Sequence, residues 1–266
     1  MLIIGERINS TRPKIQEAIK ERNTAHVVKE AIKQLAAGAK YIDVNCAVTT
    51  GDELQDMDWV ISVIQSEVPE VSICIDSPNY LSLERGLKAY KSKGSLFINS
   101  ITAEDSRINN VLPLAIKYKT KLVALTMDDS GMPDTAAGRF DIAGRIFDKV
   151  KREGFNTNDL YIDALIRPIS TEPAQAREFL KSLKMIKSLG NVNTICGLSN
   201  VSFGLPDRGL VNSIFLAMAM AEGLDAAIID PTEKHIASSL AASDALLGDD
   251  EYCGRYITAF REGRLI

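Results

Sequence analysis

Histidine and cysteine are scarce in this chain of 266 residues, which contains two histidines and four cysteines. The cysteines, at positions 46, 74, 196 and 253, form no Cys-x-x-Cys pair and have no histidine cluster beside them. This spacing argues against a disulfide framework and against a zinc site. Because reduced thiols are typical of proteins inside the cell, we expect the protein to be cytoplasmic.

The chain also lacks an excess of positive charge and a long apolar run. Its 31 Lys and Arg residues are outnumbered by 35 Asp and Glu residues, a balance that argues against a nucleic-acid partner. No apolar stretch reaches the roughly 18 residues that a membrane-spanning helix needs. The opening MLIIGERINS has none of the features of a signal peptide. We therefore expect neither nucleic acid nor membrane as a partner.

Motifs for several common chemistries are missing as well. The sequence has no Walker loop and no glycine-rich dinucleotide turn. The two histidines, His26 and His235, fall in expected helices away from strand ends, so no Ser-His-Asp arrangement is evident. Asp43, Asp76 and Asp163 are conceivable Mg²⁺ ligands, but nothing in their spacing demands an ion. We expect no metal site.

What the sequence does contain is a regular alternation of short apolar runs and longer amphipathic segments. The apolar runs are predicted to be parallel strands buried on both faces. They span residues 2–8, 41–45, 71–76, 96–100, 121–127, 160–165, 193–200 and 226–230. The predicted helices span residues 24–37, 52–67, 79–90, 103–118, 135–153, 173–189, 209–222 and 233–247. Thr24 is the expected cap of the first helix, and Gly38 is expected to end it.

Eight βα units in succession predict a single (β/α)8 TIM barrel, an α/β fold that typically takes about 250 residues. The composition, 45% hydrophobic and 25% charged, is that of an ordinary globular protein. We expect one domain over residues 1–266, with a terminal helix over 251–261 closing the barrel at its bottom or side. An open doubly wound sheet is the alternative, but eight regular units suit a barrel better.

Nearly every predicted strand ends in a carboxylate or an amide. In a barrel enzyme the strand carboxyl ends form the active-site face, so these side chains should form one ring. The ring comprises Glu6, Asn9, Asp43, Asn45, Asp76, Asn99, Asp128, Asp163, Asn200 and Asp230. Any one of them can be an ordinary turn or cap residue, but the whole set indicates a ligand site, because buried polar groups need partners.

The ring offers many hydrogen-bond acceptors and few cations, the nearest being Arg7, Arg167 and Arg208. A carboxylate can accept two hydrogen bonds from adjacent N–H groups of a ligand. The 2-amino-pyrimidinone edge of a pterin presents such a pair of donors. The residue types therefore favour a pterin-like ligand over a phosphorylated one.

Several segments resemble the methyltetrahydrofolate:corrinoid methyltransferases, a pterin-binding family related to dihydropteroate synthase and to the folate domain of cobalamin-dependent methionine synthase. They are MLIIGERIN, IDVN, CIDS, INS, LYIDALI, GLSNVS and FLAMAMAEGLDAAI. The resemblance extends over essentially the whole chain, and GLSNVS with the following helix–strand unit is its most specific part. CIDS and INS also suit the two related families.

The resemblance implies roles for particular residues. Asp76, Asn99 and Asp163 would bind the pterin. Asn200 would lie near N5 of the folate, hydrogen-bond to it and act as the catalytic residue. Arg208 would lie beside the pterin or close the site.

Two weaker carry-overs are Asp43 and Ser202, which would bind the pterin through water. The family further implies 5-methyltetrahydrofolate or tetrahydrofolate as substrate and cobalamin carried on a separate corrinoid protein. It also implies a homodimer. The pathway would be acetogenic carbon fixation or an anaerobic demethylation. The FGLPDRG loop after the seventh strand varies in this family and would contact the corrinoid partner or the folate tail.

Two other readings remain. Dihydropteroate synthases carry a Ser-x-Arg pattern after the last strand, where this chain has DPTEKH, which counts against that activity. A non-catalytic folate-binding barrel would have the same ligand residues, but Asn200 would then be dispensable for binding.

Overall fold

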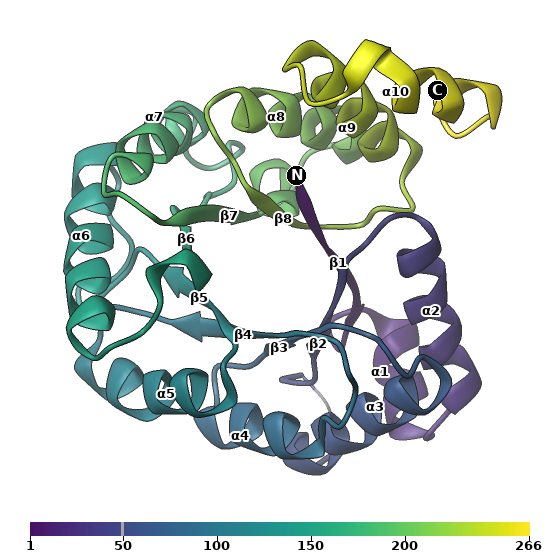
Figure 1. The fold of residues 1–266 in the computed structure, drawn as a ribbon, viewed down its shortest axis with the longest axis vertical. Helices are drawn as coiled ribbons and strands as arrows, with labels where there is room; N and C mark the ends of the chain where they lie inside the picture. Colours follow the sequence, from purple (N-terminus) through teal and green to yellow (C-terminus); the bar gives the residue numbers. More distant parts are fainter. Residues whose placement is uncertain (49–50) are drawn as a thin grey trace.

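The strands form a closed barrel of eight parallel strands in sequence order, as predicted (Figure 1). The computed structural model describes residues 1–48 and 51–266. The strands are β1 Leu2–Asn9, β2 Tyr41–Asn45, β3 Ile73–Asp76, β4 Leu96–Ile101, β5 Lys121–Leu125, β6 Leu160–Asp163, β7 Asn193–Gly197 and β8 Ala226–Ile229. β1 pairs with β8 and closes the ring.

Helices surround the barrel and cover the outer faces of its strands (Figure 1). They are α1 Pro13–Lys20, α2 Thr24–Ala36, α3 Glu53–Glu67, α4 Tyr80–Ala89, α5 Asp105–Tyr118, α6 Ala136–Arg152, α7 Gln175–Lys187, α8 Arg208–Ala221, α9 Lys234–Leu246 and α10 Gly254–Arg261. The C-terminal α10 packs against α9, outside the ring of helices. Among the described helices, none has the length and apolar content to cross a membrane.

Most predicted elements are present, but two predictions need correction. The side chain that caps α2 belongs to Asn23, whose Oδ1 accepts a hydrogen bond from the backbone N–H of His26, and Thr24 is the first helical residue. The seventh strand ends at Gly197, three residues earlier than expected, because the chain turns into a short 3-10 helix, η2 Leu198–Ser202. Gly38 does end α2, with a positive φ of 102° that favours glycine.

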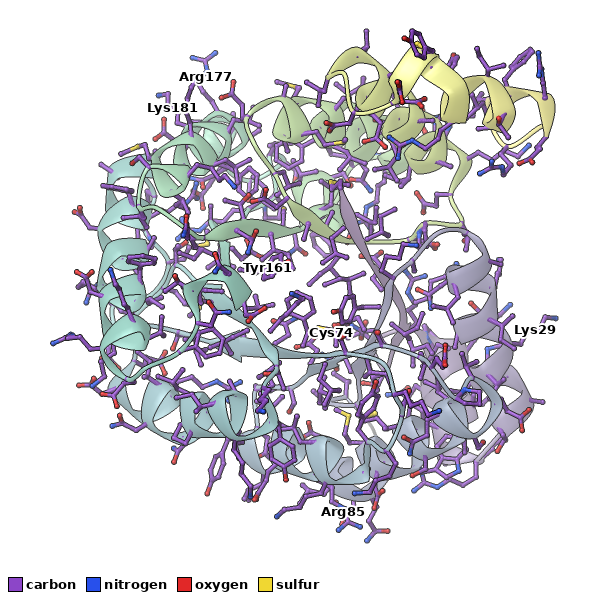
Figure 2. The ribbon with its side chains drawn as sticks, in the orientation of Figure 1. Lys29, Cys74, Arg85, Tyr161, Arg177 and Lys181 are labelled. Carbon is purple, nitrogen blue, oxygen red and sulfur yellow. The ribbon has the colours of Figure 1, made fainter. Side chains whose placement is uncertain are left out.

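The lower part of the barrel interior is filled by apolar side chains, one from each strand. They are Ile4, Tyr41, Cys74, Phe97, Val123, Tyr161, Ile195 and Ala226. The ring of Phe97 lies edge-on to Tyr41 and to Tyr161, at centroid separations of 4.9 and 4.8 Å. Figure 2 shows Cys74 and Tyr161 inside the barrel, whereas Lys29 and Arg85 project from the outer helices. This packed layer forms a floor beneath the carboxyl ends of the strands.

Candidate functional site

A cleft of about 630 Å³ lies above this floor. Side chains alternate between the two faces of a strand, so the residue two positions after each floor residue also points inward. These eight second-layer residues all line the cleft: Glu6, Asp43, Asp76, Asn99, Leu125, Asp163, Gly197 and Ile228. The period of the strands thus places three predicted aspartates and Asn99 in one cavity.

Asp76 and Asp43 form the acidic wall at β2 and β3. The Asp76 carboxylate accepts a hydrogen bond of 2.7 Å from Nδ2 of Asn45, at the end of the neighbouring strand. Burial raises the pKa of Asp76 to about 6, against the opposing effects of the Asn45 hydrogen bond and the charge of Arg107. Oδ1 of Asp43 is buried and has no hydrogen-bond partner among the described residues. Burial and the nearby charge of Asp76 raise the pKa of Asp43 well above its usual range.

Asp163, at the end of β6, is held in a fixed orientation by the backbone. Its Oδ1 accepts a 2.7 Å hydrogen bond from the N–H of Leu165, and its Oδ2 accepts a 3.4 Å bond from the N–H of Gly197. Burial raises the pKa of Asp163 to about 6, although both backbone donors act in the opposite direction. Leu165 lines the cleft and has a φ of +56°, a left-handed conformation that is uncommon for a branched side chain.

Asn200 belongs to η2, which follows β7 and overhangs the cleft. The side chain is exposed, and its Nδ2 would lie 3.7 Å from a Cβ added at Gly197. A side chain at position 197 would therefore contact the Asn200 amide, and glycine leaves that side of the amide uncovered. The Asn200 amide can therefore donate a hydrogen bond to a ligand in the cleft.

Arg208 holds η2 in place. Its Nε donates to Oγ of Ser202 at 3.0 Å, and its Nη2 donates to the carbonyl of Ser199 at 2.6 Å. Arg208 lines the cleft, whereas Ser202 is fully buried and is not part of the cleft wall. Of the seven predicted site residues, the structure brings six to the cleft, and Ser202 meets the site through its hydrogen bonds with Arg208 and with the carbonyl of Ser199.

Other residues of the cleft were not among the predicted site residues. Glu6 accepts hydrogen bonds from Nη2 of Arg12 at 3.1 Å and from Oγ of Ser199 at 3.2 Å. Burial raises the pKa of Glu6, and the charge of Arg12 opposes this. Glu6 could have been found from its position near the end of β1. Arg12 lies in the loop after β1, where no strand pattern predicts the direction of a side chain.

Asp230 also lines the cleft, but its charge is compensated. Its Oδ2 lies 2.6 Å from Nη1 of Arg7, and its Oδ1 accepts two hydrogen bonds from Thr232. Burial acts to raise the pKa of Asp230, but the Thr232 and Arg7 contacts lower it overall. Among the described residues, the cleft carboxyl groups at the ends of β2, β3 and β6 have no ion-pair partner, in contrast to Asp230 and Glu6.

This arrangement suits a flat ligand with several N–H donors better than an anion. The carboxyl groups at the ends of β2, β3 and β6 and the Asn99 amide line the cavity. Leu125 and Ile228 supply apolar walls for a ring system. No group of three or more His, Cys, Asp or Glu side chains placed to hold a metal ion occurs in residues 1–48 and 51–266.

Comparison with known proteins connects this cleft to pterin chemistry. The family model described as "Pterin binding enzyme" matches residues 5–230. A methylcorrinoid:tetrahydrofolate methyltransferase of Eubacterium limosum is 35% identical over 269 aligned residues, covering all of this chain and 98% of that protein. A methionine synthase of Mycobacterium tuberculosis is 30% identical over 86% of this chain, which spans about a fifth (20%) of that longer protein.

Solved structures show the same fold at low identity. A dihydropteroate synthase from Xanthomonas albilineans in complex with 7,8-dihydropteroate has a TM-score of 0.70 at 17% identity, over 94% of each chain. A dihydropteroate synthase from Yersinia pestis has a TM-score of 0.69 at 16% identity, over 93% of this chain and 94% of that one. At these identities the likeness establishes the barrel and no more.

Proposed function

The chain belongs to the pterin-binding enzyme family, and we propose that it moves a methyl group between N5 of tetrahydrofolate and the cobalt of a corrinoid. The observation that carries this proposal is the full-length match to the methylcorrinoid:tetrahydrofolate methyltransferase of E. limosum, because it includes every element of the barrel. The acceptor-rich cleft at the strand carboxyl ends agrees with a folate substrate.

In this proposal, Asp76, Asn99 and Asp163 bind the pterin. Their carboxylates accept hydrogen bonds from the amino group and ring N–H of the 2-amino-pyrimidinone edge, and the Asn99 amide completes the set. Asp43, with its buried unpartnered oxygen, contacts the pterin through a water molecule. Leu125 and Ile228 contact the faces of the ring.

Asn200 is the proposed catalytic residue because the resemblance assigns this role to it and because its exposed amide lines the cleft as a hydrogen-bond donor. In one direction the N5–CH3 bond breaks while cobalt(I) supplies the electron pair of the new Co–CH3 bond, and the pair left on N5 takes up a proton from water to give tetrahydrofolate. A hydrogen bond from Asn200 stabilises the charge that develops on N5. In the other direction N5 attacks methylcobalt(III), and Asn200 has the same role by microscopic reversibility.

Arg208 and Ser202 support the catalytic turn in this proposal. Because Arg208 ties Ser199 and Ser202 together, it fixes the segment that carries Asn200 and borders the pterin. Ser202 acts on the ligand through Arg208 and water. The FGLPDRG loop, with Phe203 64% exposed, lies beside this turn and is available to a docking protein.

The corrinoid is proposed to arrive on a separate corrinoid protein that docks over the carboxyl ends of the strands. The cleft opens on that face, and the name of the E. limosum relative specifies a methylcorrinoid. A single barrel domain over residues 1–266, a homodimer and a cytoplasmic location complete the proposal. Light scattering of the purified chain measures the oligomeric state.

An anaerobic absorbance assay tests the reaction. The chain is mixed with cob(I)alamin and 5-methyltetrahydrofolate, and separately with methylcobalamin and tetrahydrofolate, and the cobalamin spectrum is followed. We expect catalysed transfer in at least one mixture. Folate binding without transfer, also in the presence of a corrinoid protein, would indicate a non-catalytic folate-binding barrel. Condensation of a pterin diphosphate with p-aminobenzoate would indicate a dihydropteroate synthase.

A further inference from the structure

A second cavity of about 490 Å³ adjoins the cleft at the start of α1. Arg12 lines both cavities, so they are neighbours that share one side chain. The polar groups around the second cavity are Arg7, Arg12, Lys14, His26 and Glu30. They come from the end of β1, the start of α1 and the adjacent α2 (Figure 1). Cations outnumber carboxylates here, in contrast to the cleft.

Two of these cations are not fully compensated. Arg7 is satisfied, because its Nε lies 2.5 Å from Glu30 and its Nη1 lies 2.6 Å from Asp230. The Arg12 side chain makes one ion pair with the described residues, from Nη2 to Glu6 at 3.1 Å, and it is 39% exposed. Lys14 is exposed and forms no ion pair with any residue that the structure describes.

The backbone adds to the positive potential at this point. α1 begins at Pro13, which lines the cavity, and this end of the helix has no side-chain cap, so the positive end of the helix dipole lies at the cavity. No acidic residue occupies its first turn to neutralise that end. Arg12 and Lys14 flank the first residue of the helix, and the cavity therefore favours an anion.

The proposed folate substrate is polar at both ends, with opposite requirements. Its pterin end presents N–H donors to Asp76 and Asp163, whereas its other end carries the carboxylates of one or more glutamates. The second-layer carboxylates, with Glu6 among them, repel those groups within the cleft. The tail must therefore leave the acidic region, and Arg12 marks where the cleft meets a cationic cavity.

We propose that Arg12 and Lys14 form a subsite for the glutamate carboxylates of the folate tail, so that the protein favours polyglutamylated folates. This inference rests on the proposed function and deepens it by naming the substrate form. A monoglutamate reaches Arg12 at the junction of the two cavities. Additional glutamates extend into the second cavity toward Lys14.

The test compares three ligands: tetrahydrofolate triglutamate, tetrahydrofolate monoglutamate and the tailless 6-methyltetrahydropterin. Lys14→Gln removes the charge outside the cleft, and Lys20→Gln, on the same helix but away from the cavity, is the matched control. We expect Lys14→Gln to weaken triglutamate binding by about two- to fivefold, as for a partly exposed ion pair. Binding of the tailless pterin and all binding by Lys20→Gln stay unchanged.

Ionic strength and a second variant add independent readouts. Rising salt reduces the preference of the wild type for triglutamate over monoglutamate, because exposed charges are screened, and it does so less in Lys14→Gln. Arg12→Gln weakens both glutamylated ligands relative to the tailless pterin. An equal loss for all three ligands in both variants would overturn the subsite in favour of a structural role.

Two further outcomes would also overturn it. If Lys14→Gln changes only the KM for a corrinoid protein, the anion that this surface binds is on the partner and not on the folate. If the wild type binds none of the three ligands, the proposed function itself fails, and the tail subsite fails with it. The tailless pterin separates these cases, because it tests the cleft without the second cavity.

Discussion

At the scale of single residues, the site is defined by carboxyl groups that the ligand-free protein leaves partly unsatisfied. Burial raises the pKa values of Asp43, Asp76 and Asp163, so keeping them ionised at neutral pH costs folding free energy. A ligand that donates N–H groups to the carboxylates offsets this cost. The residues that we propose to bind substrate are then also residues that destabilise the empty protein.

Asp163→Asn tests this trade between stability and binding. A carboxyl group whose folded pKa is raised stabilises the fold below its unfolded pKa, and that contribution is lost as pH rises through the folded value of about 6. The difference of about two between the folded and the unfolded pKa of Asp163 corresponds to about 3 kcal/mol. Between pH 4 and 7, the unfolding free energy of the ligand-free wild type should therefore fall by up to that amount relative to Asp163→Asn. Parallel stability curves from urea denaturation at each pH would contradict the assignment.

Asn200→Ala separates catalysis from binding, with Asp76→Ala as its counterpart. Loss of a donor to the developing charge on N5 should slow single-turnover methyl transfer by about 10²–10³ and change folate affinity far less. Asp76→Ala should weaken affinity by about ten- to a hundredfold, because it removes a charged acceptor for the pterin. Equal losses of rate and affinity in Asn200→Ala would make Asn200 a binding residue only.

The strand pattern predicted correctly which strand-end side chains line the cleft, where the alternation within a single strand is enough to place them. Four strand-end side chains point into the barrel and line the cleft, namely Asp43, Asp76, Asn99 and Asp163. Contacts between neighbouring strands could not be predicted from the sequence. The Asn45–Asp76 hydrogen bond, for example, depends on the register of β2 against β3. The burial of Ser202 behind Arg208 is likewise a tertiary contact that no local sequence pattern predicts.

At the scale of elements, each βα unit must bring its strand beside the preceding one. The segment before β4 does this at Gly94, which passes close to the backbone of Val71 ahead of β3. A Cβ at Gly94 would lie 2.4 Å from the Val71 carbonyl oxygen, and that atom belongs to the backbone. The β3–β4 edge, which carries Asp76 and Asn99, depends on this close approach.

We expect Gly94→Ala to destabilise the protein by about 1–3 kcal/mol, as overpacking of a well-packed region does. Gly144→Ala, in the middle of α6, is the control, since its Cβ would have only Leu189 nearby, at 3.9 Å. That change should be neutral or stabilise by up to about 1 kcal/mol, because alanine favours a helix interior. Thermal unfolding measures both, and equal effects would contradict the role of Gly94.

Element prediction failed at two short helices that directly follow strand ends, α1 after β1 and η2 after β7. α1, with eight residues, was not predicted, although Pro13 at its first position is a recognised start signal. The turn of η2 was taken for the end of a strand, since its apolar residues resemble those of β7. Both segments carry residues of the proposed site, and both follow strand ends, where tertiary contacts outweigh local propensity.

At the scale of the whole molecule, the closed ring of strands explains why distant segments meet. Glu6 from β1 and Ser199 after β7 are 193 residues apart and share a hydrogen bond, because β8 closes the barrel between them. Eight βα units predicted this closure from sequence. The one face on which all strands end is also where, in the proposed reaction, the methyl donor and the methyl acceptor meet.

Transfer of a labelled methyl group tests this account most directly. 5-[¹³C-methyl]tetrahydrofolate is incubated anaerobically with cob(I)alamin and the chain, and ¹³C NMR follows the label. We predict that the N-methyl signal is replaced by a Co-methyl signal, at a rate that Asn200→Ala reduces by about two orders of magnitude or more. A label that stays on N5 with wild-type protein, also when a corrinoid protein replaces free cobalamin, would contradict the proposed methyl transfer.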